Sequence, residues 1–184
     1  MKPAVQCLGL GVVVVGATFS ASASNLYGVR YPAATDLYSV DQSSGAISSI
    51  GASGQDGIGD LTSDTRPGSP RLWGVQIASN ELYSFNPVTG AANLAATLNS
   101  PDDMVSIAFD PVSGNLYGNT SVGFGAPFDA LYQIDPATGN STFIGRIGFD
   151  NVFALGFDQG GHLFGVADAT DQFISISTAT GNGA

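Results

Sequence analysis

Three aspartates recur at one position of a repeated pattern and could bind a cation or a sugar. Asp56, Asp102 and Asp150 each precede a second aspartate by eight residues. They stand at the predicted entry to the innermost strand of each repeat, where they could ring the mouth of a central channel. Carboxylates that converge in this way suit Ca²⁺ or a polyhydroxylated ligand. Alternatively, each aspartate ends a loop and stays solvated, because the chain contains no EF-hand or other compact calcium spacing.

Further residues on the same predicted face widen this candidate site. Asp60 and Asp103 fall on or near it. Paired carboxylates such as Asp60, Asp102 or Asp150 could act on a sugar or a lactone. A Gly/Pro-rich segment, residues 122–128, carries Phe124 and Phe128. These aromatic side chains could contact a ligand, or they could fold over the edge of the sheet.

Several other kinds of chemistry are excluded by residue type. His162 is the only histidine, and it stands at the solvated start of a strand, where the other repeats carry Asn25, Arg71 and Asn115. We therefore interpret it as a turn residue. No second histidine is present to complete a zinc site, and no G-x-S-x-G motif accompanies a Ser-His-Asp set. A phosphate-binding loop would need a lysine, and the only lysine is Lys2.

The amino-terminal segment predicts export. Residues 1–23 read as a signal peptide with an apolar stretch at 8–19 and an Ala21-Ser22-Ala23 cleavage site. This stretch is shorter than the 20 or so residues that span a bilayer. We therefore expect a secreted protein, extracellular or periplasmic, with no membrane span after cleavage.

The composition that remains after cleavage limits the partners. The cleaved chain has no cysteine, so disulfides and thiolate chemistry are excluded. Four arginines face fifteen carboxylates, a formal charge of −11. This charge disfavours binding to nucleic acid or to an anionic membrane. It fits either solubility outside the cell or affinity for cations.

A repeat of about 46 residues must position these side chains. Tyr27, Trp73, Tyr117 and Phe164 occupy one repeat position, at spacings of 46, 44 and 47, and each lies in a Leu-aromatic-Gly triplet. In the third copy, strands are predicted over 104–110, 115–119, 131–135 and 141–147. A period of this length with several short strands is typical of a β-propeller blade. The aromatic residues fit packing between blades, and platforms for sugars are the alternative.

The turns carry a recognisable chemistry. Asp-Pro-x-[Ser/Thr]-Gly occurs in full at 110–114 and 135–139, with variants at 41–45, 86–90 and 177–181. Asp can accept backbone N–H bonds, Pro fixes its own φ at the first turn position, and Gly supplies the left-handed conformation that closes the hairpin. These regular turns fall on one face of the array, and the variable loops fall on the opposite face. Binding sites usually lie on variable loops.

The fold class is therefore predicted as all-β, a propeller-like array of four-stranded antiparallel blades. Residues 24–184 form one domain with copies at about 25–51, 57–98, 103–148 and 151–184. The first copy begins on its second strand and the fourth lacks its last, which gives 14 strands, about 3.5 blades and an array expected to be incomplete. Open sheet edges of this kind invite self-association.

Two stretches carry a resemblance to known proteins. They are Ile107–Gly118, which reads IAFDPVSGNLYG, and Leu131–Gly145, which reads LYQIDPATGNSTFIG. Both resemble the repeats of secreted bacterial β-propeller-like proteins of unknown function. The resemblance covers nearly all of residues 24–184. It implies an architecture but supplies no catalytic residue.

The leading functional hypothesis is a secreted, non-enzymatic binding or scaffold domain with an acidic loop face. Its partner would be an extracellular glycan or protein, with no cofactor apart from a possible Ca²⁺. The alternative is an enzyme acting on a sugar or a lactone through paired carboxylates. A third hypothesis is a structural component of a surface layer or matrix, assembled through the open sheet edges.

Overall fold

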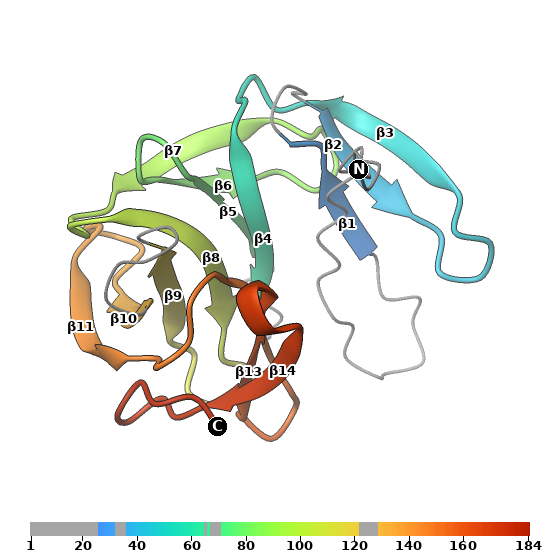
Figure 1. Cartoon of the computed structure of the whole chain (residues 1–184). Helices are drawn as coiled ribbons and strands as arrows, with labels where there is room; N and C mark the ends of the chain where they lie inside the picture. Colours follow the sequence, from blue (N-terminus) through green and yellow to red (C-terminus); the bar gives the residue numbers. More distant parts are fainter. Residues whose placement is uncertain (1–25, 32–35, 65, 67–70, 122–128) are drawn as a thin grey trace, which may run out of the picture.

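A computed structural model describes residues 26–31, 36–64, 66, 71–121 and 129–184. These residues form 14 strands in four antiparallel sheets (Figure 1), with one short 3-10 helix, η1 (Asp168–Thr170). The prediction of an all-β, propeller-like array is confirmed. We refer to the four sheets, in chain order, as blades 1 to 4.

The strands within each blade follow one another in sequence. Blade 1 contains β1 (Leu26–Val29), β2 (Asp36–Val40) and β3 (Ile47–Ala52), and blade 2 contains β4 (Ile58–Asp64), β5 (Arg71–Gln76), β6 (Glu81–Phe85) and β7 (Ala92–Thr97). Blade 3 contains β8 (Asp103–Phe109), β9 (Leu116–Ser121), β10 (Ala130–Ile134) and β11 (Ser141–Arg146), and blade 4 contains β12 (Val152–Phe157), β13 (Leu163–Ala167) and β14 (Gln172–Ile176).

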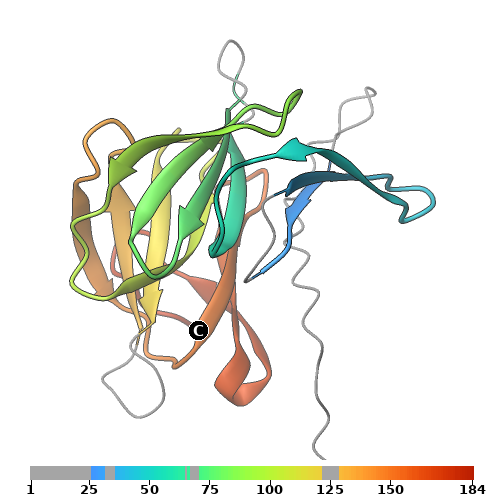
Figure 2. The ribbon, with the colours of Figure 1, turned by 90° about the horizontal axis from the view of Figure 1, so that it is seen from above.

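The blades are arranged around their inner strands. β8 contacts β4 on one side and β12 on the other, so the first strands of blades 2, 3 and 4 lie side by side. Blade 1 contributes β1 to β3, which pair as the second, third and fourth strands of a blade. It lies at one end of the array, with blade 4 at the other (Figures 1 and 2).

The carboxy-terminal residues continue the pattern of blade 4. Gly183 pairs with Ile176 in an isolated bridge, at the place where Ser141 pairs with Ile134 in blade 3. Ser175 and Ala184 exchange two backbone hydrogen bonds of 2.9 Å. Residues 183 and 184 therefore pair with β14 at the place where the fourth strand of blade 3 begins, a pairing that the sequence pattern alone did not predict.

The five predicted hairpin turns form as their sequences dictate. Each last-position glycine has a positive φ between 72° and 81°, and its N–H bonds to the first residue of the turn. Asp135 illustrates the side-chain contribution, since its carboxylate accepts from the Ala137 amide at 2.9 Å and the Thr138 hydroxyl at 2.7 Å. Local sequence therefore determines these turns.

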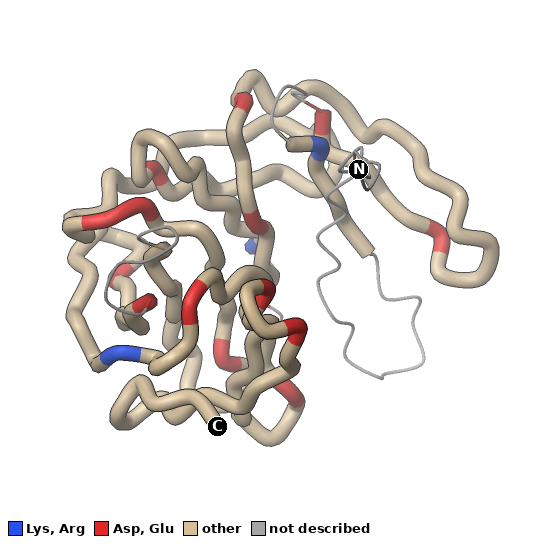
Figure 3. The backbone as a smooth tube through the Cα atoms, in the orientation of Figure 1, with Lys and Arg blue, Asp and Glu red and all other residues tan. Residues whose placement is uncertain are grey.

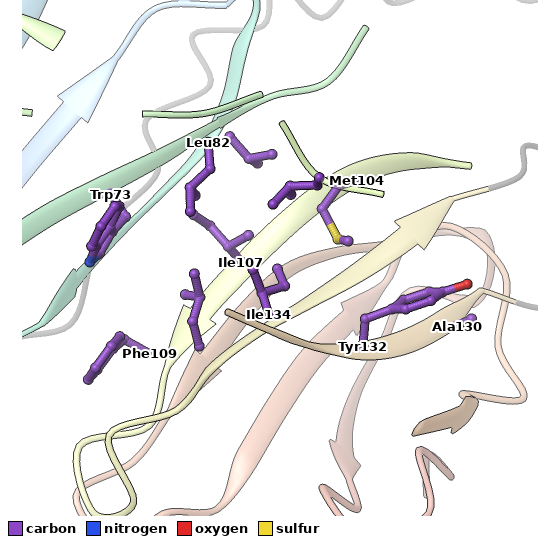
Figure 4. Close-up of a cluster of buried hydrophobic side chains, with 11 residues drawn as sticks. Trp73, Leu82, Met104, Ile107, Phe109, Ala130, Tyr132 and Ile134 are labelled. Atoms are coloured by element: carbon purple, nitrogen blue, oxygen red, sulfur yellow. The ribbon is translucent and has the colours of Figure 1, made fainter. Parts of the chain in front are cut away.

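Each sheet has a forward face toward the following blade and a rear face toward the preceding one. Trp73, Val75 and Leu82 on the forward face of blade 2 pack against Ile107 and Tyr132 on the rear face of blade 3 (Figure 4). Two similar clusters join blade 1 to blade 2 and blade 3 to blade 4. The hydrophobic core is thus divided among the junctions between blades, and burial at these junctions stabilises the array.

The outer strands meet head to tail around the array. The turn glycine of each following blade lies against the end of the outer strand of the preceding one, as for Gly90 beside Gly51 and Gly181 beside Gly145. A Cβ atom added at Gly90 would lie 2.3 Å from the carbonyl oxygen of Gly51. Only glycine lets the two backbones approach this closely.

Candidate functional site

The predicted acidic residues are distributed along the array and do not form a cluster (Figure 3). Asp56 and Asp103 are exposed, whereas Asp102 and Asp150 are half-buried. Gln76 donates to the backbone oxygen of Asp56 at 2.7 Å and to its carboxylate at 3.2 Å. One carboxylate oxygen of Asp150 is buried and has no hydrogen-bond partner.

The expected calcium ligands do not assemble. Within the residues that the structure describes, no group of three or more His, Cys, Asp or Glu side chains could hold a metal ion. Asp56, Asp102 and Asp150 all lie within those residues. The shared repeat position therefore places them in equivalent parts of different blades without bringing them to one point.

Asp60 lies inside strand β4 and not on a loop surface, so its predicted placement at a ligand-accessible face is wrong. It is 3% exposed, and its carboxylate accepts hydrogen bonds from the Ile107 amide at 3.0 Å, the Leu61 amide at 2.8 Å and the Ser106 hydroxyl. The Ser106 hydroxyl in turn accepts from the Leu155 amide at 2.7 Å. This chain of hydrogen bonds joins the inner strands of blades 2, 3 and 4.

Burial determines the ionisation of Asp60. Removal from water raises the pKa of this carboxyl to about 7, although the hydrogen bonds from Ser106, Ile107 and Leu61 act in the opposite direction. A carboxyl with a pKa in this range could act as a general acid. Its side chain is directed to Ser106 and Ile107, so it acts as a structural group at the blade junction.

The loops of the acidic face contain further side-chain hydrogen bonds that join neighbouring blades. The Asn80 side chain accepts from the Met104 amide at 2.7 Å and donates to the Asp102 carbonyl at 3.1 Å. In the next blade, Asp129 accepts from the Val152 amide at 2.7 Å. Each of these side chains connects a loop of one blade to the first residues of the inner strand of the next blade. Part of the polar character of this face is therefore structural.

Two aromatic ligand contacts and one turn histidine were predicted from the sequence. Phe124 and Phe128 lie outside the described residues. The His162 side chain is 73% exposed, and its Nδ1 lies 2.8 Å from a carboxylate oxygen of Asp158. The prediction that His162 is a turn residue is confirmed.

A groove lies on the face that carries the regular hairpin turns, opposite the variable loops that were expected to hold a binding site. It has a volume of about 580 Å³ and runs between the outer strands of blade 2 and Pro136 of blade 3. Trp73, Ser84 and Asn93 form a row across the sheet and line this groove. The Arg71 guanidinium lies 5.8 Å from the centre of the Trp73 ring.

Trp73 lines this groove although most of its side chain is buried between the blades. The side chain is 4% exposed, and its indole nitrogen is buried and has no hydrogen-bond partner. A buried N–H without an acceptor costs free energy. Arg71 adds a charged donor, and Ser84 and Asn93 add further polar groups.

A second, smaller groove of about 340 Å³ occupies the equivalent place on blade 3. Its lining includes Asn115, Gln133 and Thr142, at the positions of Arg71, Ser84 and Asn93. Neither groove brings two carboxylates together, since Asp135 is the only acidic residue that lines either. The repeat thus produces the grooves, and substitutions within it change their chemistry.

Arg71 was not predicted as a site residue, and Trp73 was predicted to pack between blades, with a platform for a sugar as the alternative. The sequence nevertheless distinguishes Arg71 and Trp73, because each differs from the residues at the same position of the other repeats. Trp73 is the only tryptophan, where the other copies have tyrosine or phenylalanine, and Arg71 stands where they have Asn or His. A residue that differs from its equivalents in the other three repeats is one that the shared architecture does not require at that position.

The fold defines a class of protein, a propeller-like array of antiparallel blades. No family model matches this chain, and no curated protein matches it. The described residues include no helix long and apolar enough to cross a membrane.

Two solved structures are similar to the chain in fold. A protein of unknown function from Bacteroides thetaiotaomicron matches with a TM-score of 0.64 and 16% identity, over 83% of this chain and 42% of that one. A chain of a nidogen/laminin complex matches with a TM-score of 0.62 and 12% identity, over 86% of this chain and 57% of that one. This chain therefore spans about half the length of the structures it matches.

Proposed function

We propose that this protein is a secreted, non-enzymatic binding domain that takes a carboxylate-bearing sugar in the groove of blade 2. The observation that supports this proposal is the Arg71 guanidinium, which lines the groove and lies 5.8 Å from the centre of the Trp73 ring. A guanidinium can bind a carboxylate with two parallel hydrogen bonds. Ser84 and Asn93 supply further polar groups suited to sugar hydroxyls.

The distribution of carboxylates favours binding over catalysis. A glycosidase needs two carboxyl groups about 5–10 Å apart at one site. Asp60 is enclosed by hydrogen bonds, and neither described groove contains a pair of acids. The resemblance to secreted bacterial propeller-like proteins of unknown function fits a binding or scaffold role outside the cell.

Isothermal titration calorimetry with D-glucuronate tests the groove, with D-glucose as the neutral comparison. We expect R71N to weaken glucuronate binding about tenfold, because a charge-assisted hydrogen bond is lost. W73F should weaken it by a smaller factor, since an aromatic ring remains beside the Arg71 guanidinium. Asn and Phe already occupy the equivalent positions 115 and 164, so both variants suit the fold.

The control variant is R30N, because Arg30 is also exposed but does not line the groove. Glucuronate binding that is equal in wild type and R71N, or weakened equally by R30N, would contradict the proposed site. Release of nitrophenol from p-nitrophenyl glycosides, abolished in D102N or D150N, would favour the enzyme hypothesis instead.

Export remains part of this proposal. Residues 1–23, the predicted signal peptide, lie outside the described residues. Amino-terminal sequencing of the exported protein should give Ser24 as the first residue, and a mature protein that begins at Met1 would contradict cleavage.

A further inference from the structure

The grooves of blades 2 and 3 lie next to each other and share one wall. Pro136 lines both of them. It belongs to the hairpin turn 135–139, which joins the two outer strands of blade 3, and Pro87 holds the equivalent place beside the groove of blade 2. A ligand that fills one groove therefore reaches the other by crossing a single turn.

Blade 2 holds this shared turn in place. The Asn99 amide donates to the Gly139 carbonyl at 3.2 Å, and the Asn99 side-chain oxygen accepts from the Ser141 amide at 2.6 Å. A Cβ atom added at Gly139 would lie 2.2 Å from the Thr97 carbonyl oxygen, so the two backbones are in close contact. These contacts give the two grooves a fixed relative position, and a preorganised site binds at a lower entropic cost.

The groove of blade 3 has the chemistry of a site for a neutral sugar. Asn115, Gln133 and Thr142 line it with amide and hydroxyl groups, which suit the hydroxyls of a sugar. Neither Lys nor Arg is among the described residues that line this groove. It therefore offers hydrogen bonds without the positive charge that Arg71 supplies in blade 2.

Asp135 makes the groove of blade 3 unfavourable for a carboxylate. It lines the groove, and hydrogen bonds from the Thr138 hydroxyl and the Ala137 amide lower its pKa. The Asp135 side chain is therefore ionised at neutral pH. A carboxylate-bearing sugar placed beside it would be repelled, and a neutral sugar would not.

Gln133 is a residue that the shared architecture does not require. Its cross-strand partner is the aromatic residue of the Leu-aromatic-Gly triplet, and in the other three blades this partner position is held by serine, at Ser39, Ser84 and Ser175. The Gln133 side chain is exposed. Arg71 and Gln133 thus both differ from their repeat equivalents, and each brings more hydrogen-bonding groups to its groove.

We propose that the two grooves form one extended site for an acidic oligosaccharide in which a carboxylate-bearing sugar is linked to a neutral one. This inference rests on the function proposed for the groove of blade 2. The carboxylate-bearing unit lies beside Arg71, the neutral unit lies beside Gln133, and the linkage between them crosses Pro136. Two linked contacts bind more tightly than one, because the second forms at a high effective concentration.

Isothermal titration calorimetry with a hyaluronan tetrasaccharide tests the extended site, because glucuronate alternates in it with neutral N-acetylglucosamine. The wild type should bind the tetrasaccharide about tenfold or more tightly than D-glucuronate. Tetragalacturonate carries a carboxylate on every unit. It should gain much less over D-galacturonate, because one of its carboxylates would lie beside Asp135.

Two variants examine the groove of blade 3 separately. Q133S should reduce the ratio of tetrasaccharide affinity to glucuronate affinity about three- to tenfold, because hydrogen bonds to the neutral unit are lost. Serine holds this position in the other blades, so the variant suits the fold. N115R places at position 115 the residue that blade 2 has at position 71, and it should strengthen tetragalacturonate binding about tenfold.

The matched control is Q172S. Gln172 is also an exposed glutamine on a strand, but it lines neither groove, so the ratio of the two affinities should stay at its wild-type value. An equal fall of this ratio in Q172S and Q133S would overturn the extended site. Unchanged tetragalacturonate binding in N115R would likewise remove the groove of blade 3 from the site.

Failure of this inference can be told apart from failure of the proposed function. Glucuronate binding that R71N weakens, together with a tetrasaccharide that binds no more tightly than D-glucuronate, would leave the single groove of blade 2 and exclude the extended site. Absence of glucuronate binding, or binding that R71N does not change, would contradict the proposed function and the extended site together.

Discussion

At the scale of single residues, ionisable side chains serve the architecture in two opposite ways. The turn aspartates Asp41, Asp135 and Asp158 are exposed, and hydrogen bonds lower their pKa, as the Ser43 hydroxyl and neighbouring donors lower the pKa of Asp41 to about 2. Asp60 is buried, and desolvation raises its pKa to about 7. The two kinds of carboxyl therefore shift stability in different pH ranges.

We predict that the stability of the protein falls as the pH rises from about 4 to 7. The folded-state pKa of Asp60 is about 7, above the ordinary value of 3.8, so the folded protein holds this proton more tightly than the unfolded chain. The contribution is complete below pH 4 and is lost as the pH rises through 7. Such a difference in pKa is worth on the order of 4 kcal/mol. Urea denaturation at a series of pH values measures it.

The matched variant for this prediction is D60N, which cannot ionise. Its stability should be nearly constant between pH 5 and 8. Below pH 4 both proteins should lose stability, because the lowered-pKa turn aspartates Asp41, Asp135 and Asp158 become protonated there. An equal fall in stability toward neutral pH in D60N and wild type would show that another group is responsible.

At the scale of elements, the strands and their turns were predictable because their determinants are local. Period-2 alternation and the Asp-Pro-x-[Ser/Thr]-Gly motif act over a few residues, so the predicted strands 104–110 and 131–135 match β8 and β10 to within one residue. The contacts between blades were not predictable in the same way. The Asp60 carboxylate is buried because Ser106 and Ile107, 46 and 47 residues away, lie against it.

The junctions between outer strands give a prediction at this scale. G90A and G45A each place alanine at a positive φ, of 80° and 72°, at a backbone cost of about 1 kcal/mol. G90A should cost about 2 kcal/mol more, since its Cβ would collide with the Gly51 carbonyl in blade 1. Chemical denaturation of both variants measures the difference.

Gly45 serves as the control because no atom lies within 4 Å of an added Cβ there. Equal destabilisation by the two substitutions would mean that backbone conformation, and not contact between blades, accounts for the effect.

At the scale of the whole molecule, stability should be uneven along the array. Strands β8 and β9 of blade 3 are almost entirely buried, whereas β3 of blade 1 has no buried residue. Blade 1 is therefore expected to open more readily than blade 3.

Hydrogen exchange monitored by mass spectrometry tests this expectation. Among the described strands, β1 to β3 should exchange faster than β8 to β10 by a factor of about ten or more, since local opening costs less free energy where fewer side chains are buried. Equal protection in blades 1 and 3 would indicate that the array opens as one unit.

The sequence by itself determined the strands, the turns and the propeller-like class, because these depend on alternation and turn chemistry within a few residues. It also identified His162 as a turn residue. Only the tertiary structure decided that Asp60 is buried and that Trp73 and Arg71 line a groove. The physical reason is that exposure and ionisation depend on what the neighbouring blade supplies, and that neighbour lies more than 40 residues away along the chain.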